Sequence, residues 1–292
     1  MADIRPMEAD DVEAAEALWH HSWEALRLAY ALPGAPATAE DRARLRRRIE
    51  HLWRTDPEGS WVADDHGMVV GIAQAFVRQD LWVLSLLGVA VSAQSQGVGK
   101  ALLNRALTYG SPDSPGLILS SRDPRAMHRY VRAGFRLHPA VVAVGELDRD
   151  RLAAAAASAE MHRVRKGDAA DMAHVAAVSR AQRGAVHEPD IHFLLGEGAR
   201  LFLVDGGFAL FGATRPMLVA AADDDGARAL LLAGLADVHH GAGVEVLWMT
   251  GSQQWAIEAC TELGLELHPA GAVMVRGAPG PLQPYLPNGA FG

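Results

Sequence analysis

Two glycines and two amide side chains lie close together in the segment Gln94–Leu103, which reads QSQGVGKALL. The segment follows an apolar run and opens a predicted helix, so its glycines stand where a strand leads into a helix. Unpaired backbone N–H groups and the positive end of a helix dipole converge at such a turn. Gly97 and Gly99 let an anion approach the backbone, and Gln94 adds a neutral donor. The segment predicts a pyrophosphate-binding loop, although glycines at such a turn often serve the turn alone.

The elements that must position this loop alternate between helices and strands. A short strand around Ile4 precedes a helix that Asp10 or Asp11 can cap, and the apolar stripe of this helix is Val12, Ala15, Leu18, Trp19, Ser22 and Leu26. A second helix begins at a capping box formed by Thr38 and Asp41. The remaining pattern predicts, in order, a break at 32–36, two strands within 60–77, a strand at 82–91, a helix at 99–109, a strand at 117–121 and a helix at 124–133. This order predicts an α/β fold, with a mixed sheet and helices on its faces.

The chain also repeats itself weakly. GFRLHPA at 134–140 returns as GLELHPA at 264–270, an offset of 130 positions, and IRPMEADDV from Ile4 pairs with VRKGDAADM from Val164. The two offsets differ, so the second copy is shorter by about 30 residues. We therefore predict two related domains in tandem, one over 1–150 and one over 160–292, joined by an alanine-rich stretch at 152–159.

Composition excludes several classes of protein. Of the 292 residues, 50% are hydrophobic and 21% charged, which is typical of a folded chain with room for two cores. The net charge of -8 argues against a nucleic-acid partner, because phosphate neutralisation needs an excess of Lys and Arg. A lone cysteine, Cys260, fits a reducing compartment. The acidic N-terminus is unlike a signal peptide, and the longest apolar run, Leu81–Val91, is too short to span a membrane. We expect a cytoplasmic protein without a membrane partner, either a monomer or a homodimer.

A second motif follows the loop: the segment Asp123–Phe135 reads DPRAMHRYVRAGF, and its Tyr130 lies 36 positions after Gln94. Together the two motifs resemble the GNAT superfamily of acyl-CoA-dependent N-acyltransferases over about residues 3–145. That family's loop has the form Gln/Arg-x-x-Gly-x-Gly/Ala, and its later helix has Asn-Pro-x-Ala, three residues, then Tyr-x-x-x-Gly-Phe. The chain supplies Pro124, Ala126, Tyr130, Gly134 and Phe135, with Asp123 where Asn is usual.

The resemblance implies that acetyl-CoA or another acyl-CoA is the donor and lies in a cleft between splayed neighbouring strands, with no metal involved. It implies that these residues bind the cofactor: Val89, Ala90, Val91, Gln94, Ser95, Gln96, Gly97, Val98, Gly99, Lys100, Asp123, Ala126 and Tyr130. By the same resemblance, backbone N–H groups near Val89 and Ala90 meet the acyl carbonyl and the pantetheine arm.

The transfer needs an acid for the departing thiolate, and Tyr130 lies where the family often places it. A phenol with a pKa of about 10 stays protonated at neutral pH and can hydrogen-bond a thiolate whose acid has a pKa of about 8.5. Alternatively, Tyr130 only packs its helix against the sheet. His128 lies two positions away, so it points to another side of the helix.

The transfer also needs a base to remove the amine proton. By the resemblance, many family members carry a carboxylate for this on the strand before the loop. This chain has Ser85, Leu86 and Leu87 there. Either a water relay removes the amine proton or another residue does so. Glu24 is the first candidate because it lies near the end of the helix that typically borders the acceptor, and His20 and His21 follow. Each of the three also fits an ordinary surface position.

The second copy has lost the loop chemistry on this interpretation. Aligning MLVAAADDDGARALL with GVAVSAQSQGVGKALL puts Asp225 at Gly97, so that Asp223, Asp224 and Asp225 would face the phosphates. The offset of 130 puts Cys260 at Tyr130, where a buried apolar role is the simpler interpretation. The layout, though not the order of the halves, resembles tandem GNAT proteins with one degenerate half.

Two functions are compatible with these patterns. The first is an N-acetyltransferase acting on a small amine by direct attack, and the second is a non-catalytic acyl-CoA-binding sensor or scaffold. The retained Tyr130 favours the enzyme, and the missing strand carboxylate favours the binding protein. The tail at 277–292 is rich in Pro and Gly, but Tyr285, Leu286 and Phe291 are too apolar for a free end, and we expect it to pack at the domain junction near the acceptor.

Overall fold

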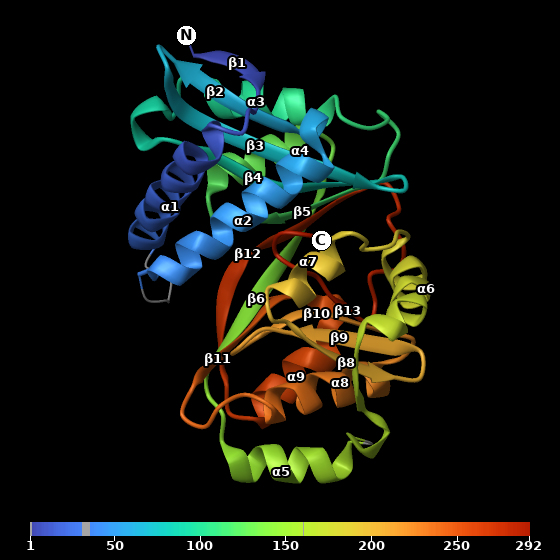
Figure 1. The fold of residues 1–292 in the computed structure, drawn as a ribbon. Helices are drawn as coiled ribbons and strands as arrows, with labels where there is room; N and C mark the ends of the chain where they lie inside the picture. Colours follow the sequence, from blue (N-terminus) through green and yellow to red (C-terminus); the bar gives the residue numbers. More distant parts are fainter. Residues whose placement is uncertain (1, 31–35, 160) are drawn as a thin grey trace. The chain divides into compact units, whose positions relative to one another are not determined.

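A computed structural model describes residues 2–30, 36–159 and 161–292 (Figure 1). The break predicted at 32–36 lies outside the described residues, apart from its last one. The chain divides into two compact units, Met1–Ile118 and Leu119–Gly292. Both units contain strands and helices, and the predicted division at 150–160 stays a prediction.

The first unit is built on the strands β1 to β5. Its elements are β1 (Asp3–Pro6), α1 (Asp11–Ala29), α2 (Ala39–Thr55), β2 (Ser60–Asp65), β3 (Met68–Arg78), β4 (Leu81–Val89), α3 (Val98–Leu107) and β5 (Gly116–Ser120), with short 3-10 turns at Pro57–Gly59 and Val91–Ala93. β1 to β4 pair antiparallel in chain order, and β5 pairs parallel with β4. The α/β order and mixed sheet predicted from the sequence are confirmed.

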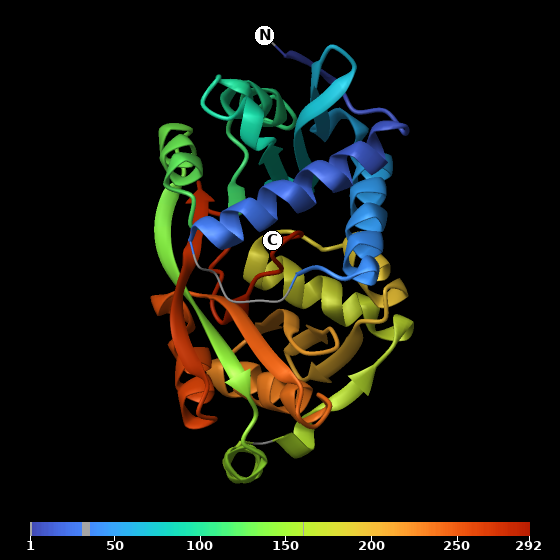
Figure 2. The same ribbon diagram turned by 90° about the vertical axis from the view of Figure 1, so that its left-hand side faces the viewer.

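Helices cover both faces of this sheet. Val12, Ala15 and Leu18 of α1 share a core with α2 and the strands, as the predicted apolar stripe requires. α3 covers the opposite face, where a Cβ on Gly71 would come within 2.7 Å of Leu102. Figure 2 shows α1 and α2 crossing at a large angle.

The helix starts were predicted with mixed success. The capping box of Thr38 and Asp41 is present. Asp10 is the N-cap of α1 but makes no side-chain cap bond. Asp11 instead accepts two hydrogen bonds from the Arg5 guanidinium, at 2.7 and 2.8 Å, and one from the Glu8 N–H. An ion pair with Arg5 of β1, six positions earlier, takes the place of a side-chain cap.

The second unit contains the remaining elements. These are α4 (Pro124–Arg132), β6 (Arg136–Glu146), α5 (Arg149–Ser158), β7 (Arg165–Gly167), α6 (Met172–Arg183), α7 (Asp190–Gly196), β8 (Arg200–Val204), β9 (Gly207–Phe211), β10 (Pro216–Ala221), α8 (Asp224–Ala236), β11 (Gly243–Met249), α9 (Gln254–Glu262), β12 (Glu266–Arg276) and β13 (Tyr285–Leu286), with 3-10 turns at Met161–Arg163, Ala169–Asp171 and Gly251–Gln253. β6 pairs antiparallel with both β12 and β11, and a separate antiparallel sheet has the order β13-β10-β9-β8-β7.

The sequence repeat is visible in these elements. The helix–strand pair α4–β6 recurs as α9–β12 with every boundary displaced by 130 positions. β6 and β12 lie side by side in antiparallel register, Pro139 opposite Ala272 and Pro269 opposite Val141 (Figure 2). The repeated strand therefore pairs with its own copy.

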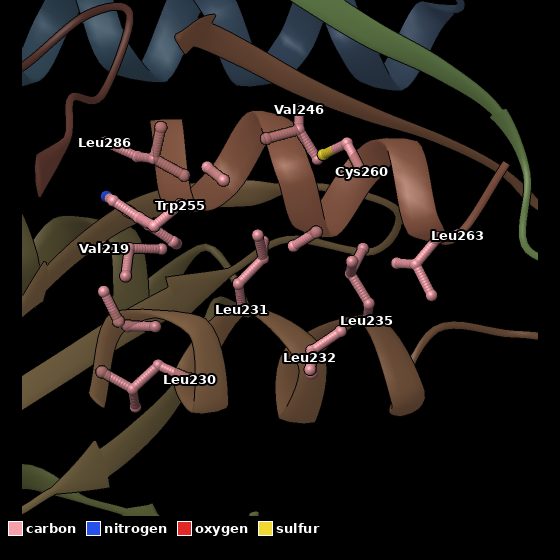
Figure 3. Packing of buried hydrophobic residues seen from close by; sticks show 14 of the residues in the cluster. Val219, Leu230, Leu231, Leu232, Leu235, Val246, Trp255, Cys260, Leu263 and Leu286 are labelled. Carbon is pink, nitrogen blue, oxygen red and sulfur yellow. The ribbon is translucent and has the colours of Figure 1, made fainter. Parts of the chain in front are cut away.

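The core of the second unit lies around α8 and α9 (Figure 3). Leucines of α8 pack against Trp255 and Cys260 of α9 and against strands β10 and β11. The alanine-rich stretch predicted as a joining segment is part of α5, which buries Leu152 and Ala155 in this cluster. It is thus a packed helix of the second unit.

Candidate functional site

The predicted pyrophosphate loop leads into α3 at a left-handed residue. Gly97 is the N-cap with φ of 88°, and its carbonyl accepts from the N–H groups of Lys100 and Ala101 at 3.0 Å. The backbone N–H groups of residues 95–99 donate to no acceptor among the described residues. Because nothing caps the helix, these donors and the positive end of its dipole are available to an anion.

The loop also offers room for an anion. A Cβ on Gly97 would meet no atom within 4 Å, so the space beside this residue is open. Ser95 also has a positive φ of 63°, and Lys100 is exposed in the first turn of α3. A compact anion with several oxygens suits this arrangement of backbone donors and one cation.

Gln94 has a different contact from the one that the sequence suggested. Its side-chain amide donates to the carbonyl oxygen of Val89 at 3.1 Å. The bond joins the loop to the last residue of β4, so Gln94 shapes the turn. The backbone N–H groups of the loop remain its candidate donors to a phosphate.

β4 separates from β5 shortly before this turn. The two strands pair only at Trp82, Val83 and Leu84. The register of β4 with β3 shifts at the next residue, so Ser85 is the extra residue of a β-bulge, and its hydroxyl is buried with no partner among the described residues. A bulge bends its strand, which explains why β4 turns away from β5 here.

The two backbone N–H groups predicted to meet the acyl group differ in availability. The Ala90 N–H donates to the Val70 carbonyl at 2.9 Å and is therefore occupied. Val89 lies opposite Gly71, next to Ala90, which makes the ladder bond to Val70. Because hydrogen-bonded and non-hydrogen-bonded pairs alternate along an antiparallel ladder, Val89 and Gly71 form a non-hydrogen-bonded pair. The N–H and carbonyl of Val89 consequently point away from β3, toward the edge that β5 has left.

α1 packs directly against this end of β4 through the side of the helix that carries the predicted apolar stripe. The Ser22 hydroxyl donates to the Val89 carbonyl at 3.1 Å. A Cβ on Gly88 would lie 3.1 Å from the Trp19 ring, so glycine permits the close packing. Trp19 stacks on Trp23, which is 40% exposed. The apolar stripe predicted contact with the sheet, but no signal in the sequence indicates which carbonyl Ser22 meets.

The candidate bases lie on the same helix. Glu24 accepts from Arg27 at 2.9 and 2.5 Å, and this bond holds the pKa of Glu24 below its usual range. The Nδ1 of His21 donates to the Ala17 carbonyl at 2.6 Å, and the ring of His20 lies edge-on to it. The three side chains are thus on the helix that borders the end of β4.

The second motif belongs to the second unit. Asp123 is the N-cap of α4 and accepts from the Arg125 N–H at 2.9 Å, which an Asn side chain would do equally well. Burial alone would raise the pKa of Asp123, but hydrogen bonds from Arg125 lower it overall. The N–H of Ala126 bonds to the Asp123 carbonyl at 3.1 Å.

Tyr130 is a buried residue of α4, 5% exposed, and its hydroxyl makes no hydrogen bond to the described residues. Burial raises its pKa above the ordinary value of a phenol, and the nearby Arg129 offsets part of that effect. The side chain therefore keeps its proton throughout the neutral range and has an unused donor.

Comparison with known proteins gives the family of this region. Residues 16–135 match the model of the Acetyltransferase (GNAT) family. This part of the chain belongs to the GNAT family. No curated protein sequence matches the chain.

Solved structures show a GNAT fold over nearly the whole chain. A proposed acetyltransferase of Pyrococcus horikoshii has 17% identity and a TM-score of 0.75, covering 99% of this chain and 95% of its own. A GCN5-related N-acetyltransferase of Sphaerobacter thermophilus has 13% identity and a TM-score of 0.57, covering 94% and 95%. A tandem GNAT protein from the clavulanic acid biosynthesis pathway has 15% identity and a TM-score of 0.57, covering 94% and 98%. The predicted fold of two GNAT-like domains in tandem is confirmed.

The GNAT-like second half begins its helix α8 differently from α3. Asp223 is the N-cap of α8, and its carboxylate accepts from the Gly226 N–H at 2.8 Å. By position in the helix, Asp223 therefore corresponds to Gly97, whereas the sequence alignment put Asp225 there. Cys260 is fully buried, and burial raises its pKa to about 12, which fits an inert apolar role.

Two further features of the described part of the chain bear on the site. No helix there combines the length and the hydropathy that crossing a membrane requires. An open cavity of about 430 Å³ near Trp61 and Tyr109 contains none of the predicted site residues.

Proposed function

We propose that this chain is an acyl-CoA-dependent N-acetyltransferase that transfers an acetyl group from acetyl-CoA to the amine of a small acceptor. The observation that carries this proposal is the start of α3, where the N–H groups of residues 95–99 lack described acceptors and the space beside Gly97 is open. A pyrophosphate would accept from these groups at the positive end of the helix dipole. Membership of an acetyltransferase family supports the same donor.

The proposed reaction is a direct attack. The amine nitrogen attacks the thioester carbonyl carbon, the C–N bond forms, and the C–S bond then breaks to release the CoA thiolate. The negative charge on the carbonyl oxygen needs a donor, and the Val89 N–H at the open edge of β4 suits that role.

Tyr130 is the proposed general acid for the thiolate. Its raised pKa keeps the proton in place until the thiolate forms, and its hydroxyl has no other described partner. The amine proton is removed by Glu24 or by a water relay. The bond from Arg27 makes Glu24 a weaker base than a free carboxylate, which is the argument for the relay.

We propose that the second half binds no CoA. The Asp223 carboxylate already accepts from the Gly226 N–H at the start of α8, and Asp224 and Asp225 add negative charge to the first turn. An anion would therefore meet repulsion there. On this proposal the chain is a cytoplasmic enzyme with one active half.

The alternative is a protein that binds acyl-CoA without reacting it. The observation that favours it is the absence of a carboxylate at residues 85–87 of β4. Measuring free thiol released from acetyl-CoA across a panel of small amines separates the two. Release that depends on one class of amine, and disappears in the Gly97→Glu variant, supports the enzyme; binding of acetyl-CoA without release supports the sensor.

A further inference from the structure

The carbonyl of Val89 receives two side-chain hydrogen bonds at the point where β4 ends. Ser22 donates from α1 and Gln94 donates from the pyrophosphate loop, each at 3.1 Å. A strand-end carbonyl commonly bonds to water or to the next strand. Here two elements far apart in the sequence converge on one oxygen.

The Val89 carbonyl lies on the same strand edge as the Val89 N–H. The N–H and the carbonyl of Val89 point to the same side, away from β3, because Ala90 makes the ladder bond to Val70. β5 pairs with β4 only as far as Leu84. A negative carbonyl dipole therefore shares an edge with the N–H group that our proposed mechanism uses.

We propose that Ser22 is a positioning residue that, together with Gln94, fixes the Val89 carbonyl. The fixed strand end aims the Val89 N–H at the acyl oxygen, and the two donors partly neutralise the negative end of the carbonyl dipole. The inference rests on the proposed function for its catalytic consequence. A bare carbonyl would lie on the same strand edge as the developing oxyanion and would repel it. Two donors reduce that repulsion and restrict rotation of the 89–90 peptide, which adjoins the peptide that carries the Val89 N–H.

The packing of α1 keeps the Ser22 hydroxyl in place. Trp19 lies one helical turn before Ser22 and fits against Gly88, where a side chain would clash at 3.1 Å. Ser22 is partly buried, so its bond to Val89 is shielded from competition by solvent. The same contact connects the helix that carries Glu24 to the loop that contacts the donor, because Ser22 and Gln94 share one acceptor.

The kinetic test uses Ser22→Ala, with Ser22→Thr to restore the hydroxyl and Ser92→Ala as the matched control. Ser92 is exposed, and its hydroxyl makes no hydrogen bond to the described residues. We expect Ser22→Ala to lower kcat about tenfold while KM for acetyl-CoA changes less than about twofold, since an interaction of the transition state is lost. Ser22→Thr should recover most of kcat. An unchanged kcat in Ser22→Ala, or a loss that Ser22→Thr does not restore, would overturn the inference.

A second measurement does not depend on activity. Hydrogen exchange of the peptide spanning 86–92 should be at least about threefold faster in Ser22→Ala than in wild type and Ser92→Ala, with the melting temperature unchanged. Equal exchange in all three proteins would overturn the positioning role. If wild type releases no thiol from acetyl-CoA with any amine, the proposed function fails, and the exchange result still decides whether Ser22 fixes the strand end.

Discussion

Gly97 and Asp223 occupy the same position in two related turns, each being the N-cap of the helix that follows its strand. At Gly97 the N–H groups of the helix start have no acceptor among the described residues, and the adjoining space is open. At Asp223 a carboxylate already accepts from the helix start. We therefore predict that the turn at Gly97 binds an anion and that the turn at Asp223, which already holds a carboxylate, does not.

The first prediction is that each chain binds one molecule of CoA. Gly97→Glu should abolish binding, because the new carboxylate would enter the space that the pyrophosphate needs. At an effective dielectric of ~20, two like charges about 5 Å apart repel by roughly 3 kcal/mol, enough to weaken binding about a hundredfold. Titration calorimetry with CoA measures both the stoichiometry and the loss.

Gly67→Glu is the matched control for that experiment. Gly67 has a positive φ of 85°, and a Cβ there would also meet no atom within 4 Å, so the backbone strain and the added charge are alike. This variant should bind CoA as wild type does. A stoichiometry of two, or normal binding by Gly97→Glu, would show that the wrong loop has been assigned.

The second prediction concerns Tyr130. Replacing it with Phe should lower kcat by roughly 10² to 10⁴, while affinity for acetyl-CoA changes little, because the phenol acts only as the thiolate leaves. Since burial raises its pKa, the wild-type rate should show no loss from deprotonation of this acid below about pH 10. Tyr109→Phe is the comparison: Tyr109 donates to Asp56 at 3.0 Å, so its loss should reduce stability and spare kcat. Unchanged turnover in Tyr130→Phe would remove this residue from the mechanism.

The third prediction tests whether Glu24 or a water relay removes the amine proton. If Glu24 is the base, Glu24→Gln should lower kcat roughly 10²-fold, and Arg27→Gln should keep most of the activity. The Arg27 bond lowers the pKa of Glu24, so the charged, active form persists below the usual pKa of about 4.3. Without Arg27 the pKa rises, and the acid side of the kcat profile should move to higher pH. Full activity in Glu24→Gln would mean that a water relay, and not Glu24, removes the amine proton.

The local features of this fold could be predicted from the sequence, and the long-range ones could not. The glycine loop, the capping box at Thr38 and the repeat at 130 positions are encoded by neighbouring residues or by self-similarity, and the structure contains them. The bonds of Ser22 and Gln94 to Val89 depend on how α1 and the bulged strand pack. Asp10 or Asp11 was expected as a cap; Asp10 is the N-cap without a side-chain bond, and Asp11 pairs with Arg5 of β1.

The last prediction concerns the tail, which forms an edge strand of the second unit. Tyr285 and Leu286 pair with Ala220 and Val219 of β10, and both side chains are buried. Leu286 belongs to the core around α8 and α9, so Leu286→Ala should lower the free energy of unfolding by about 2–5 kcal/mol through the cavity it leaves. Leu137→Ala is the matched control, because that leucine is 40% exposed and its loss should change the free energy of unfolding little.

Deleting residues 284–292 should destabilise the unit further, since it also uncovers the edge of β10. Thermal and urea unfolding of the full chain measure all three. Equal stability of wild type and the deletion would mean that the tail contributes nothing to this core.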